Sequence, residues 1–353
     1  MGDAQFFFSV IIPVYNKWKL TEQCLRSLKA CTREYLYEVI VVDNASTDET
    51  ATCLDTLGKT LFEEHFVSIR LTENINFGPA CNRGAAKARA PFLFFLNNDT
   101  ILTEHWAIPL CQAFTSASPS LAAIGPLLLY ENRTVQHVGV AFGVLHPLHL
   151  YRYFPQTHPA VQKKRDVQAL TAAALMIRRV AFLSVGGFHE AYKNGYEDVD
   201  LCLVLRRNGH TLQCIPQSVI YHLESQTPGR HVHAQHNADI LQQRCGHLFH
   251  PDVHIHGMRD GFLPFVADDL DIALTLEPQE DSELFSRAQG KPLQYWRDVI
   301  DENPLWLGGR RHVAEWAERQ GQSALALLLY SELAFWSRSK ADYDNLLSME
   351  DLS

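Results

Sequence analysis

Three apolar stretches of this chain end abruptly in side chains that could bind a metal ion or another polar ligand. Residues 37–42, 92–96 and 219–221 are followed by Asp43-Asn44, Asn97-Asn98-Asp99 and His222, respectively. Carboxylate oxygens suit hard divalent cations such as Mg²⁺ and Mn²⁺, and an imidazole ligand favours Mn²⁺. Because Asn and Asp are also common in ordinary turns, each group by itself is weak evidence for a site.

A fourth group consists of Glu197-Asp198 with Asp200 close behind, and it opens a segment with helical spacing that ends near Asn208. Carboxylates at a helix N-terminus are favourable with the helix dipole and need no catalytic role. Adjacent side chains on a helix point in different directions, so the three acids cannot all share one role. One of them could deprotonate a substrate hydroxyl group while the others cap the helix or bind the substrate.

The elements that carry these groups alternate between strand and helix. The sequence predicts strands at residues 6–14, 37–42, 67–71 and 92–96, and helices at 19–30, about 48–57 (with Thr47 or Asp48 as N-cap) and 80–88. This alternation is typical of a doubly wound, mostly parallel sheet flanked by helices. The carboxyl ends of its strands lie on one edge, where open α/β sheets bind ligands. The polar ends of these four strands are Tyr15-Asn16, Asp43-Asn44, Asn74–Asn76 and Asn97–Asp99. Four polar strand ends on that edge favour a pocket over four unrelated turns.

Beyond Thr100 the alternation is looser. The sequence predicts helices at 106–114 and 199–208, and strands at 122–129, 135–144, 212–215 and 219–221. Residues 145–166 read as a long loop, and loops of that length in compact domains are often functional.

The C-terminal part of the chain has a different composition from about residue 258 onward. Residues 260–280 are acidic, and residues 294–337 are helical in pattern and rich in Trp, Leu and Ala. Within them, residues 303–331 predict a helix–turn–helix pair with Gln320-Gly321-Gln322 as its turn. We therefore expect two domains: residues 1–257, and residues 258–353 as an acidic linker with a small helical appendage.

The composition argues against several classes of protein. A net charge of −9 over 353 residues does not suit a nucleic-acid binder dominated by phosphate contacts. The eight cysteines include no Cys-x-x-Cys pair, which favours reduced thiols in the cytoplasm over a zinc ribbon. No stretch approaches the roughly 18 apolar residues of a transmembrane helix, and the acidic Asp3 does not fit a secretory signal. Residues 222–256 hold eight of the 17 histidines but lack tight ligand spacing, so only His222 is singled out.

A nucleotide is one ligand that these strand ends could hold. The Asp43 carboxylate can accept hydrogen bonds from ribose hydroxyls or a base N–H, although it could instead cap the next helix. A diphosphate needs basic side chains or a divalent cation, and this edge of the sheet shows neither Gly-x-Gly-x-x-Gly nor Gly-Lys-Ser/Thr. A cation held by Asp99 fits better, because Mg²⁺ and Mn²⁺ bind one or two protein groups together with substrate phosphates. His222 is a candidate second ligand.

An ordered set of motifs in this chain resembles that of the inverting, family-2-type glycosyltransferases of the GT-A fold. The matching motifs are Ser9–Asn16 (SVIIPVYN), Val41–Asp48 (VVDNASTD), Asn74–Gly78 (NINFG), Asn82-Arg83-Gly84, Phe95–Thr100 (FLNNDT), Gly186-Gly187-Phe188 and Tyr196–Leu201 (YEDVDL). Each motif is weak by itself, whereas the ordered set, which covers roughly residues 7–225, is specific. The chain looks most like the bacterial branch that builds rhamnose-containing and other surface polysaccharides or glycosylates proteins.

The resemblance implies roles for the matching positions. Pro13, Tyr15, Asn16, Asp43 and Asn44 would hold the nucleotide, Asn76, Gly78 and Asn82 would line its far side, and Arg230 could reach the diphosphate from a flap formed by residues 222–236. Asn97-Asn98-Asp99 occupies the Asp-x-Asp position of the family, with Asp99 and His222 as metal ligands, Asp198 as the catalytic base and Glu197 as its neighbour. Asn97 replaces the first carboxylate of that motif, which leaves the cation fewer charged ligands. His189 stands where the family usually has Asp, which could alter the choice of acceptor.

The implied reaction is transfer of a hexosyl or deoxyhexosyl group from a UDP- or dTDP-sugar to a hydroxyl of a glycan or protein, with Mn²⁺ or Mg²⁺ as cofactor. Such an enzyme would act in the cytoplasm, either free or associated with the inner face of the cell membrane. One alternative is a GT-A-like protein that binds a sugar nucleotide or glycan without turnover. Another is a transferase whose C-terminal helices recruit a protein acceptor.

Overall fold

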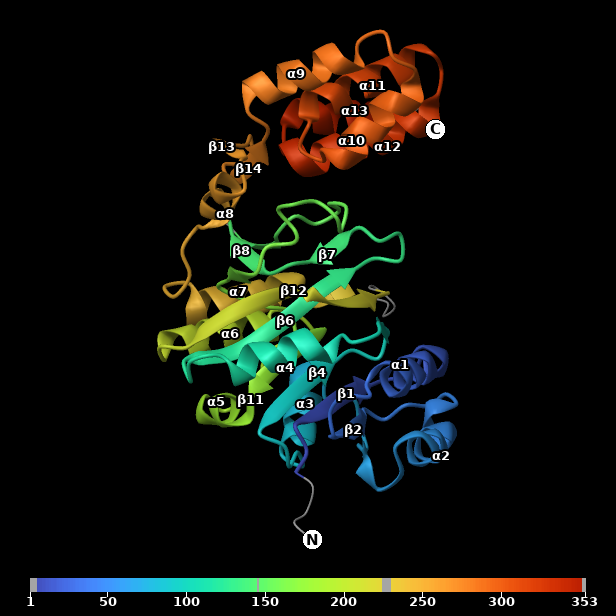
Figure 1. The fold of residues 1–353 in the computed structure, drawn as a ribbon, viewed down its shortest axis with the longest axis vertical. Helices are drawn as coiled ribbons and strands as arrows, with labels where there is room; N and C mark the ends of the chain where they lie inside the picture. Colours follow the sequence, from blue (N-terminus) through green and yellow to red (C-terminus); the bar gives the residue numbers. More distant parts are fainter. Residues whose placement is uncertain (1–4, 145, 224–229, 351–353) are drawn as a thin grey trace. The chain divides into compact units, whose positions relative to one another are not determined.

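The computed structural model describes residues 5–144, 146–223 and 230–350, and the chain divides into two compact units (Figure 1). The first, here called the sheet unit, consists of residues 1–140, 149–152 and 161–249. The second, the helical unit, consists of residues 141–148, 153–160 and 250–353. The predicted domain boundary at residue 257 falls inside helix α8 (Val253–Arg259), which belongs to the helical unit.

The sheet unit is built on a ten-stranded sheet in the order β10-β12-β6-β11-β4-β1-β2-β3, with β5 paired to β12 and β7 paired to β6. The strands are β1 (Phe8–Val14), β2 (Tyr37–Asp43), β3 (Phe66–Arg70), β4 (Phe92–Leu96), β5 (Thr100–Leu102), β6 (Leu121–Leu129), β7 (Val135–His137), β10 (Arg165–Asp166), β11 (Ala174–Arg178) and β12 (Thr211–His222). Strands β1 to β4 pair in parallel, whereas β11 runs antiparallel to both β4 and β6. The predicted doubly wound, mostly parallel sheet is confirmed.

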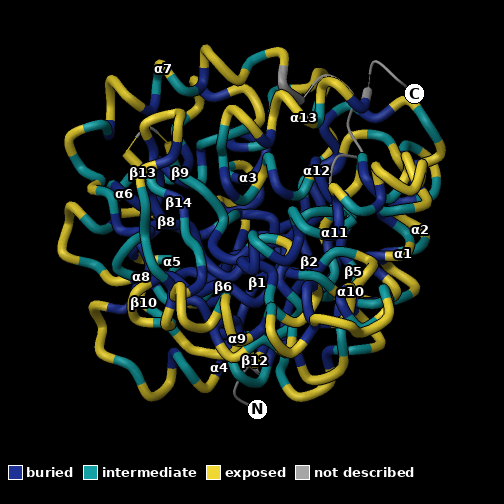
Figure 2. The backbone as a smooth tube through the Cα atoms, turned by 90° about the horizontal axis from the view of Figure 1, so that it is seen from above, coloured by how far each residue is buried: buried dark blue, intermediate teal, exposed yellow. Residues whose placement is uncertain are grey.

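The helices of the sheet unit cover both faces of this sheet. They are α1 (Trp18–Cys31), α2 (Thr50–Phe62), α3 (Phe77–Ala85), α4 (Ala107–Thr115), α5 (Arg179–Ser184), α6 (Glu197–Arg207) and α7 (Ala234–Cys245). One buried cluster joins α1, α2 and α4 to alternate residues of β1, such as Val10 and Ile12. Helix α3 packs on the other face, where a Cβ atom added at Gly84 would lie 2.6 Å from Ile11 Cγ2. Figure 2 shows the central strands buried along their length.

Two predicted strands differ from the observed ones for identifiable reasons. The segment predicted as one strand at 135–144 is two, β7 and β8 (Val140–Phe142), because the chain turns at Gly139 with φ of 109°. The two short strands predicted at 212–215 and 219–221 are one strand, β12, whose pairing with β6 is irregular between Ile215 and Val219. Pro216 lies in that interval and has no N–H to donate, so the ladder breaks there and then resumes.

The helical unit contains a two-stranded antiparallel sheet and a set of helices. Its elements are β13 (Leu263–Val266), β14 (Ile272–Thr275), α8, α9 (Pro278–Ala288), α10 (Leu293–Glu302), α11 (Leu307–Arg319), α12 (Ser323–Ser337) and α13 (Lys340–Glu350), and β9 (Pro147–His149) lies in the loop predicted at 145–166. The predicted helix–turn–helix pair corresponds to α11 and α12, joined through Gly321 at φ of 67°. Among the described helices, none combines the length and the apolar character needed to cross a bilayer.

The acidic segment predicted as a linker is folded. Asp271 is fully buried, and its carboxylate accepts hydrogen bonds from the backbone N–H groups of Val144 and Ile272. Burial opposes ionisation, but those N–H groups and the nearby Arg338 outweigh it, so the pKa of Asp271 lies below its ordinary value. Asp271 therefore stays ionised and anchors β14 within the helical unit.

Candidate active site

Asp99 and His222 meet where three strands of the sheet unit end. The turn Asn97–Asp99 links β4 to β5, and β5 pairs antiparallel with β12 so that Thr100 lies opposite His222. This register brings His222 Nε2 to 3.1 Å from Asp99 Oδ1 and to 3.2 Å from Asn97 Nδ2. The two residues predicted as metal ligands are thus adjacent, and we call Asn97, Asp99 and His222 the strand-end corner.

Gln136 is a neighbour of this corner that the sequence did not reveal. Its Oε1 lies 2.6 Å from His222 Nδ1, and its Nε2 donates a hydrogen bond to the His222 carbonyl oxygen at 3.1 Å. Cys24 also lies close, with Sγ 3.4 Å from Thr100 Oγ1. Burial raises the pKa of the Cys24 thiol to about 12, so Cys24 is a neutral thiol in this structure.

The donor set of the strand-end corner fits a hard cation that shares its coordination with a substrate. A carboxylate oxygen and an imidazole nitrogen face each other there, and Asn98 is turned away, donating from Nδ2 to Thr21 Oγ1 at 2.9 Å. Within residues 5–144, 146–223 and 230–350 there is no group of three or more His, Cys, Asp or Glu side chains placed to hold a metal. Two protein ligands suit Mg²⁺ or Mn²⁺ bound together with phosphates, rather than a cation enclosed by protein alone.

The polar residues after β2 hold neighbouring loops together. Asp43 is 2% exposed, its Oδ1 accepts from Ser46 N–H at 2.8 Å, and its Oδ2 lies 3.6 Å from Arg70 Nη1. Asn44 accepts a hydrogen bond from Ile75 N–H at 2.8 Å and donates one to the Asn76 carbonyl oxygen at 3.2 Å. These bonds join the turns that follow β2 and β3 into one rim at the carboxyl edge of the sheet.

The turn after β1 is tied to the same rim. Asn16 adopts a left-handed conformation (φ of 56°), and its Oδ1 accepts from the N–H groups of Thr47 and Asp48 at 2.7 and 3.3 Å. Asp48 in turn accepts from the N–H groups of Trp18 and Thr50, at 2.9 and 3.0 Å, so it caps the first turns of both α1 and α2.

Two residues of that turn remain accessible to a ligand. Tyr15 is 45% exposed, and Pro13 is half-buried at the end of β1. The exposed Tyr15 ring could therefore stack against a planar base. The nearby Asn16 amide and Asp48 carboxylate are already hydrogen-bonded to the main chain of the loops.

Asn82 and Gly78 lie on α3 and face the Gly186–Phe188 segment. Asn82 Oδ1 accepts from Phe188 N–H at 2.9 Å, and Asn82 Nδ2 donates to the Phe188 carbonyl oxygen at 2.8 Å. A Cβ atom added at Gly78 would lie 3.2 Å from Phe188 Cβ, so the helix and this segment are in close contact. Asn82, predicted to line the ligand pocket, has its amide engaged in holding this segment in place.

The three acids at the start of α6 point to three different places, as predicted. Glu197 is 6% exposed and accepts from Gly195 N–H. Asp200 is 2% exposed and accepts from Tyr192 Oη at 2.9 Å and from Arg244 Nε at 2.7 Å. Asp198 is half-buried, and its two oxygens accept from the N–H groups of Ala172 and Val199, each at 2.9 Å. We call Glu197, Asp198 and Asp200 the α6 acids, and Asp198 is the least enclosed of them.

The loop before α6 is fastened to two other helices. Asn237 of α7 accepts from Lys193 N–H at 3.0 Å and donates to the Lys193 carbonyl oxygen at 3.1 Å. Asn194 Oδ1 accepts from Phe77 N–H, at the start of α3, at 2.9 Å. The predicted flap includes residues 224–229 and the Arg230 side chain, which lie outside the described residues.

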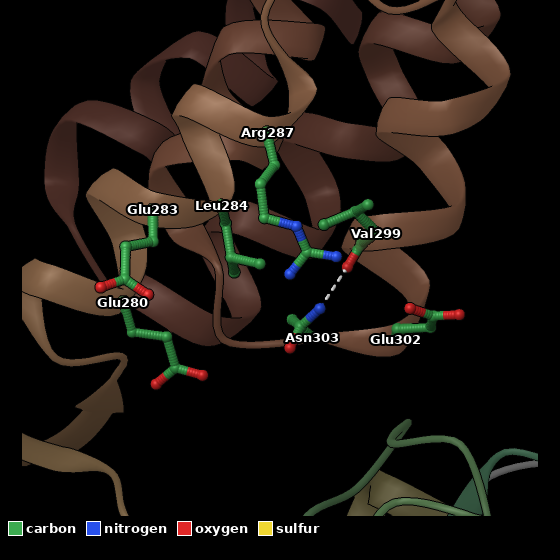
Figure 3. Close-up of a pocket in the computed structure, with 7 residues that line it drawn as sticks. All are labelled: Glu280, Glu283, Leu284, Arg287, Val299, Glu302 and Asn303. Carbon is green, nitrogen blue, oxygen red and sulfur yellow. Dashed lines mark hydrogen bonds between the residues drawn. The ribbon is translucent and has the colours of Figure 1, made fainter.

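A separate cavity of about 290 Å³ lies in the helical unit (Figure 3). Its lining residues come from α9, α10 and the turn after α10: Glu280, Glu283, Leu284, Arg287, Val299, Glu302 and Asn303. Asn303 Nδ2 donates to the Val299 carbonyl oxygen at 2.8 Å, which closes the end of α10. None of the predicted site residues lines this cavity, so it is distinct from the site in the sheet.

A comparison with protein families accounts for this arrangement. Residues 9–184, which include β1 to β4, the strand-end turn and the Asp43 rim, match the model of glycosyl transferase family 2. The chain belongs to glycosyltransferase family 2. The family predicted from the ordered motifs is therefore confirmed.

Curated relatives of this family 2 glycosyltransferase include bacterial proteins of surface-glycan synthesis. It is 30% identical over 321 residues to the O-antigen biosynthesis protein RfbC of Myxococcus xanthus, covering 88% of this chain and 24% of RfbC. It is 26% identical over 266 residues to the N-acetylglucosaminyl-diphospho-decaprenol L-rhamnosyltransferase of Mycobacterium tuberculosis, covering 66% and 82% of the two chains. The chain spans only 24%, 27% and 41% of the first three curated relatives that it matches.

Solved structures confirm the GT-A fold. The mannosyltransferase PcManGT from Pyrobaculum calidifontis, in complex with GDP-Man and Mn²⁺, matches with a TM-score of 0.51 and 16% identity, over 99% of this chain and 87% of that one. GalNAc-T7 with UDP, GalNAc and Mn²⁺ matches with a TM-score of 0.51 and 19% identity, over 62% and 44% of the two chains. At these identities the likeness concerns the fold alone.

Proposed function

We propose that this family 2 glycosyltransferase moves a hexosyl or deoxyhexosyl group from a UDP- or dTDP-sugar to a hydroxyl of a glycan or protein acceptor, with inversion of configuration. The observation that carries the proposal is the approach of His222 Nε2 to Asp99 Oδ1, at 3.1 Å, on the carboxyl edge of the sheet. Two ligands from distant parts of the chain converge there, on the edge that also carries Asp43. A diphosphate bound at this edge could complete the coordination of a cation.

The nucleoside part of the donor would bind over the rim made by the turns after β1, β2 and β3. Tyr15 offers an exposed ring for stacking on the base, at the end of β1. Asp43 would accept a hydrogen bond from the base or ribose on one lone pair while it holds Ser46 N–H on another. Because Asn16 and Asn44 fix the loops, the rim would be formed before the donor arrives.

The strand-end corner would hold the cofactor. Asp99 and His222 would bind Mn²⁺ or Mg²⁺, which when present supplies positive charge against the diphosphate leaving group. Both relatives of known structure named above were solved with Mn²⁺, and the pairing of imidazole with carboxylate in this chain favours the same ion.

Asp198 would act as the general base. Its carboxylate removes the proton of the acceptor hydroxyl as that oxygen forms a bond to the anomeric carbon. The bond from the anomeric carbon to the diphosphate oxygen breaks on the opposite face, the diphosphate leaves with the bonding electron pair, and the configuration inverts. Glu197 and Asp200 are buried and hold the loop and the helix, so they position Asp198 rather than touch the acceptor.

The acceptor and its location are proposed from the relatives. One relative is an O-antigen biosynthesis protein and another transfers rhamnose to a lipid-linked sugar by its name, which favours a glycan over a protein acceptor here. All eight cysteines are unpaired thiols in the structure, which suits a reducing compartment such as the cytoplasm. A protein acceptor recruited by the helical unit is the second candidate.

The test is a screen of UDP- and dTDP-sugars for donor turnover with Mn²⁺, repeated with Asp99→Asn and Asp198→Asn. We expect one donor class to be turned over and both variants to be impaired by at least about tenfold. Asp239→Asn is the matched control, because Asp239 is an exposed carboxylate on α7 that accepts a hydrogen bond from Gln235 Nε2 at 2.8 Å. Turnover that is equal in all four proteins would overturn the mechanism, and donor binding without turnover would favour the non-catalytic alternative.

A further inference from the structure

Gln136 lies at an irregular point of the sheet, next to the strand-end corner. Strand β7 pairs antiparallel with β6, but the register shifts between Leu128, which faces His137, and Leu129, which faces Val135. Gln136 is the residue left over in that pairing. Such a bulge re-aims a side chain that a regular strand would direct to the opposite face, and bulges are frequent beside active sites.

The bulge places the Gln136 amide against both ends of His222. Gln136 Nε2 donates to the His222 carbonyl oxygen at 3.1 Å, and Gln136 Oε1 lies 2.6 Å from His222 Nδ1. Since the amide nitrogen is the donor to the carbonyl, the amide oxygen is the acceptor toward the ring, and Nδ1 carries the hydrogen. The lone pair of a neutral ring is then on Nε2, the nitrogen that Asn97 Nδ2 approaches to 3.2 Å and that faces Asp99 Oδ1 at 3.1 Å.

We infer that Gln136 is a positioning residue that orients the His222 ring so that Nε2 is presented to a divalent cation. The inference rests on the proposed function, because it takes Asp99 and His222 as the cation's ligands. A histidine that ligates a metal usually donates its other ring N–H to a fixed acceptor, and loss of that acceptor lowers metal affinity by about 10–100-fold. Gln136 is 5% exposed and His222 is also 5% exposed, so water cannot easily replace the amide as partner.

The fixed geometry has a second consequence for the ring. The bond to the His222 main chain fixes the Gln136 amide, and the amide oxygen then holds the Nδ1 edge of the ring, which restricts rotation of the imidazole. The cation would then find its nitrogen ligand already oriented, which reduces the ordering cost of binding. Gln136 itself touches neither the cation nor the substrate in this arrangement.

The experiment measures Mn²⁺ affinity of the full chain from the EPR signal of free Mn²⁺, in the presence of UDP and separately of dTDP, because the two protein ligands would share the cation with a diphosphate. Titrations of each nucleotide without protein correct for the Mn²⁺ that the nucleotide binds by itself. Gln136→Leu should bind Mn²⁺ about 10–100-fold more weakly than the unsubstituted protein. Gln136→Glu keeps an acceptor for the Nδ1 hydrogen and should bind more tightly than Gln136→Leu by at least about threefold. If Gln136→Leu does not fold, Gln136→Asn, whose amide is one methylene too short to reach the ring, should show the same weakening.

The matched control is Ser218→Ala on the same strand as His222. Ser218 is fully buried and donates to the Trp106 carbonyl oxygen at 2.7 Å, so its loss removes a buried hydrogen bond from β12 without touching His222. Thermal unfolding of all variants shows whether destabilisation is comparable. We expect Ser218→Ala to keep the Mn²⁺ affinity of the unsubstituted protein, because general loosening of β12 is not what weakens the metal site.

Two further variants separate this inference from the proposed function. Asp99→Asn and His222→Asn remove the ligands themselves and should weaken Mn²⁺ binding at least as much as Gln136→Leu. If neither ligand variant alters Mn²⁺ binding, or the unsubstituted protein binds none, the proposed metal site is wrong. If both ligand variants weaken binding while Gln136→Leu behaves like Ser218→Ala, the metal site stands and the role of Gln136 is disproved.

Discussion

The strand-end corner and the α6 acids are held in place in different ways. Asp99 and His222 are positioned by backbone pairing, because β5 and β12 share a ladder in which Thr100 faces His222. Asp198 is positioned by side chains, since Asn82, Asn194 and Asn237 fasten the loops around it and Arg244 holds Asp200. A strand register is an all-or-none arrangement, whereas a loop held by separate side-chain bonds can loosen in steps.

This difference fits the tasks proposed for the two regions. Cation ligands must keep a fixed separation, which a sheet provides. A base must meet acceptors of varying shape, which a loop and the first turn of a helix can accommodate. We therefore expect substitutions near Asp198 to give graded effects on the rate, and substitutions at the strand ends to act on metal and donor binding together.

The largest expected effect is on the base itself. Asp198→Asn should lower the rate of sugar transfer by about 10²- to 10⁴-fold, the range for loss of a general base, while donor affinity stays within about threefold. The amide oxygen of Asn can still accept from Ala172 N–H, so the fold should be retained. Single-turnover transfer and equilibrium donor binding measure the two quantities. If donor binding were lost together with the rate, Asp198 would not act on the rate alone, and the proposed difference between the two regions would be wrong.

The second largest effect concerns the bond between α7 and α6. Arg244→Met leaves the Asp200 carboxylate, 3% exposed at its side chain, without its bidentate cation. Because the Arg244 side chain is itself 37% exposed, we expect about 2–3 kcal/mol of lost stability rather than the full cost of breaking a buried pair. Urea unfolding measures the loss. Arg26→Met, which breaks an exposed helix pair with Glu22, should leave the urea midpoint nearly unchanged.

A smaller effect should appear in the pH dependence of stability near the strand-end corner. Burial, followed by the nearby His149 and His222, holds the pKa of His137 well below its ordinary value. The unfolded chain therefore binds more protons than the folded one below about pH 6.5, and stability should fall as the pH drops through that value. The slope that His137 contributes is at most about 1.4 kcal/mol per pH unit.

Urea midpoints at pH 5.0, 6.0 and 7.5 test this expectation, with His137→Gln as the variant. The variant should lose part of the pH dependence while keeping the plateau above neutral pH. His105→Gln is the control, because the His105 side chain is 70% exposed. An unchanged slope in His137→Gln would show that His137 does not govern the acid sensitivity of this part of the sheet.

The smallest expected effect tests the fastening of the loop before α6. Asn82→Ala removes the bonds at 2.8 and 2.9 Å to the Phe188 main chain and should cost about 1 kcal/mol. If Asn82 positions the loop rather than binding the donor, the transfer rate should fall more than the donor affinity does. The comparison of kcat with donor Kd decides between the two roles. A change in donor Kd without a change in kcat would indicate that Asn82 binds the donor.

Much of the fold was predictable because its signals are local. Strand β4 is a continuous apolar run, β1 and β2 are mostly apolar, and the helices between them show apolar spacing, so their bounds follow closely from the sequence. One error arose at 135–144, where the chain turns at Gly139 inside a segment that reads as one strand. The other arose where a local pattern was interrupted without ending the element. Pro216 divides the apolar pattern of β12 in two, yet the strand continues because pairing with β6 resumes at Val219.

The sequence supplied candidate residues for the proposed site but little about their contacts. Asp99, Asp198 and His222 were singled out by residue type at strand and helix ends. The use of Asn82 as a loop fastener was not foreseen, because a side-chain amide offers the same chemistry to a ligand and to a neighbouring main chain. Gln136 gave no signal, since a glutamine in a short strand has no pattern that marks a bulge.

The sequence by itself determined the family, the alternation of strands and helices, and the residues that follow each strand. These depend on interactions between neighbours in the chain, which residue order specifies directly. Only the tertiary structure decided that Asp99 lies near His222 Nε2, that Gln136 contacts His222 Nδ1, and that the three α6 acids point in different directions. Those contacts depend on strand register, on a bulge and on packing between distant segments. Burial of the whole sheet, rather than any local stretch of sequence, fixes that register and packing.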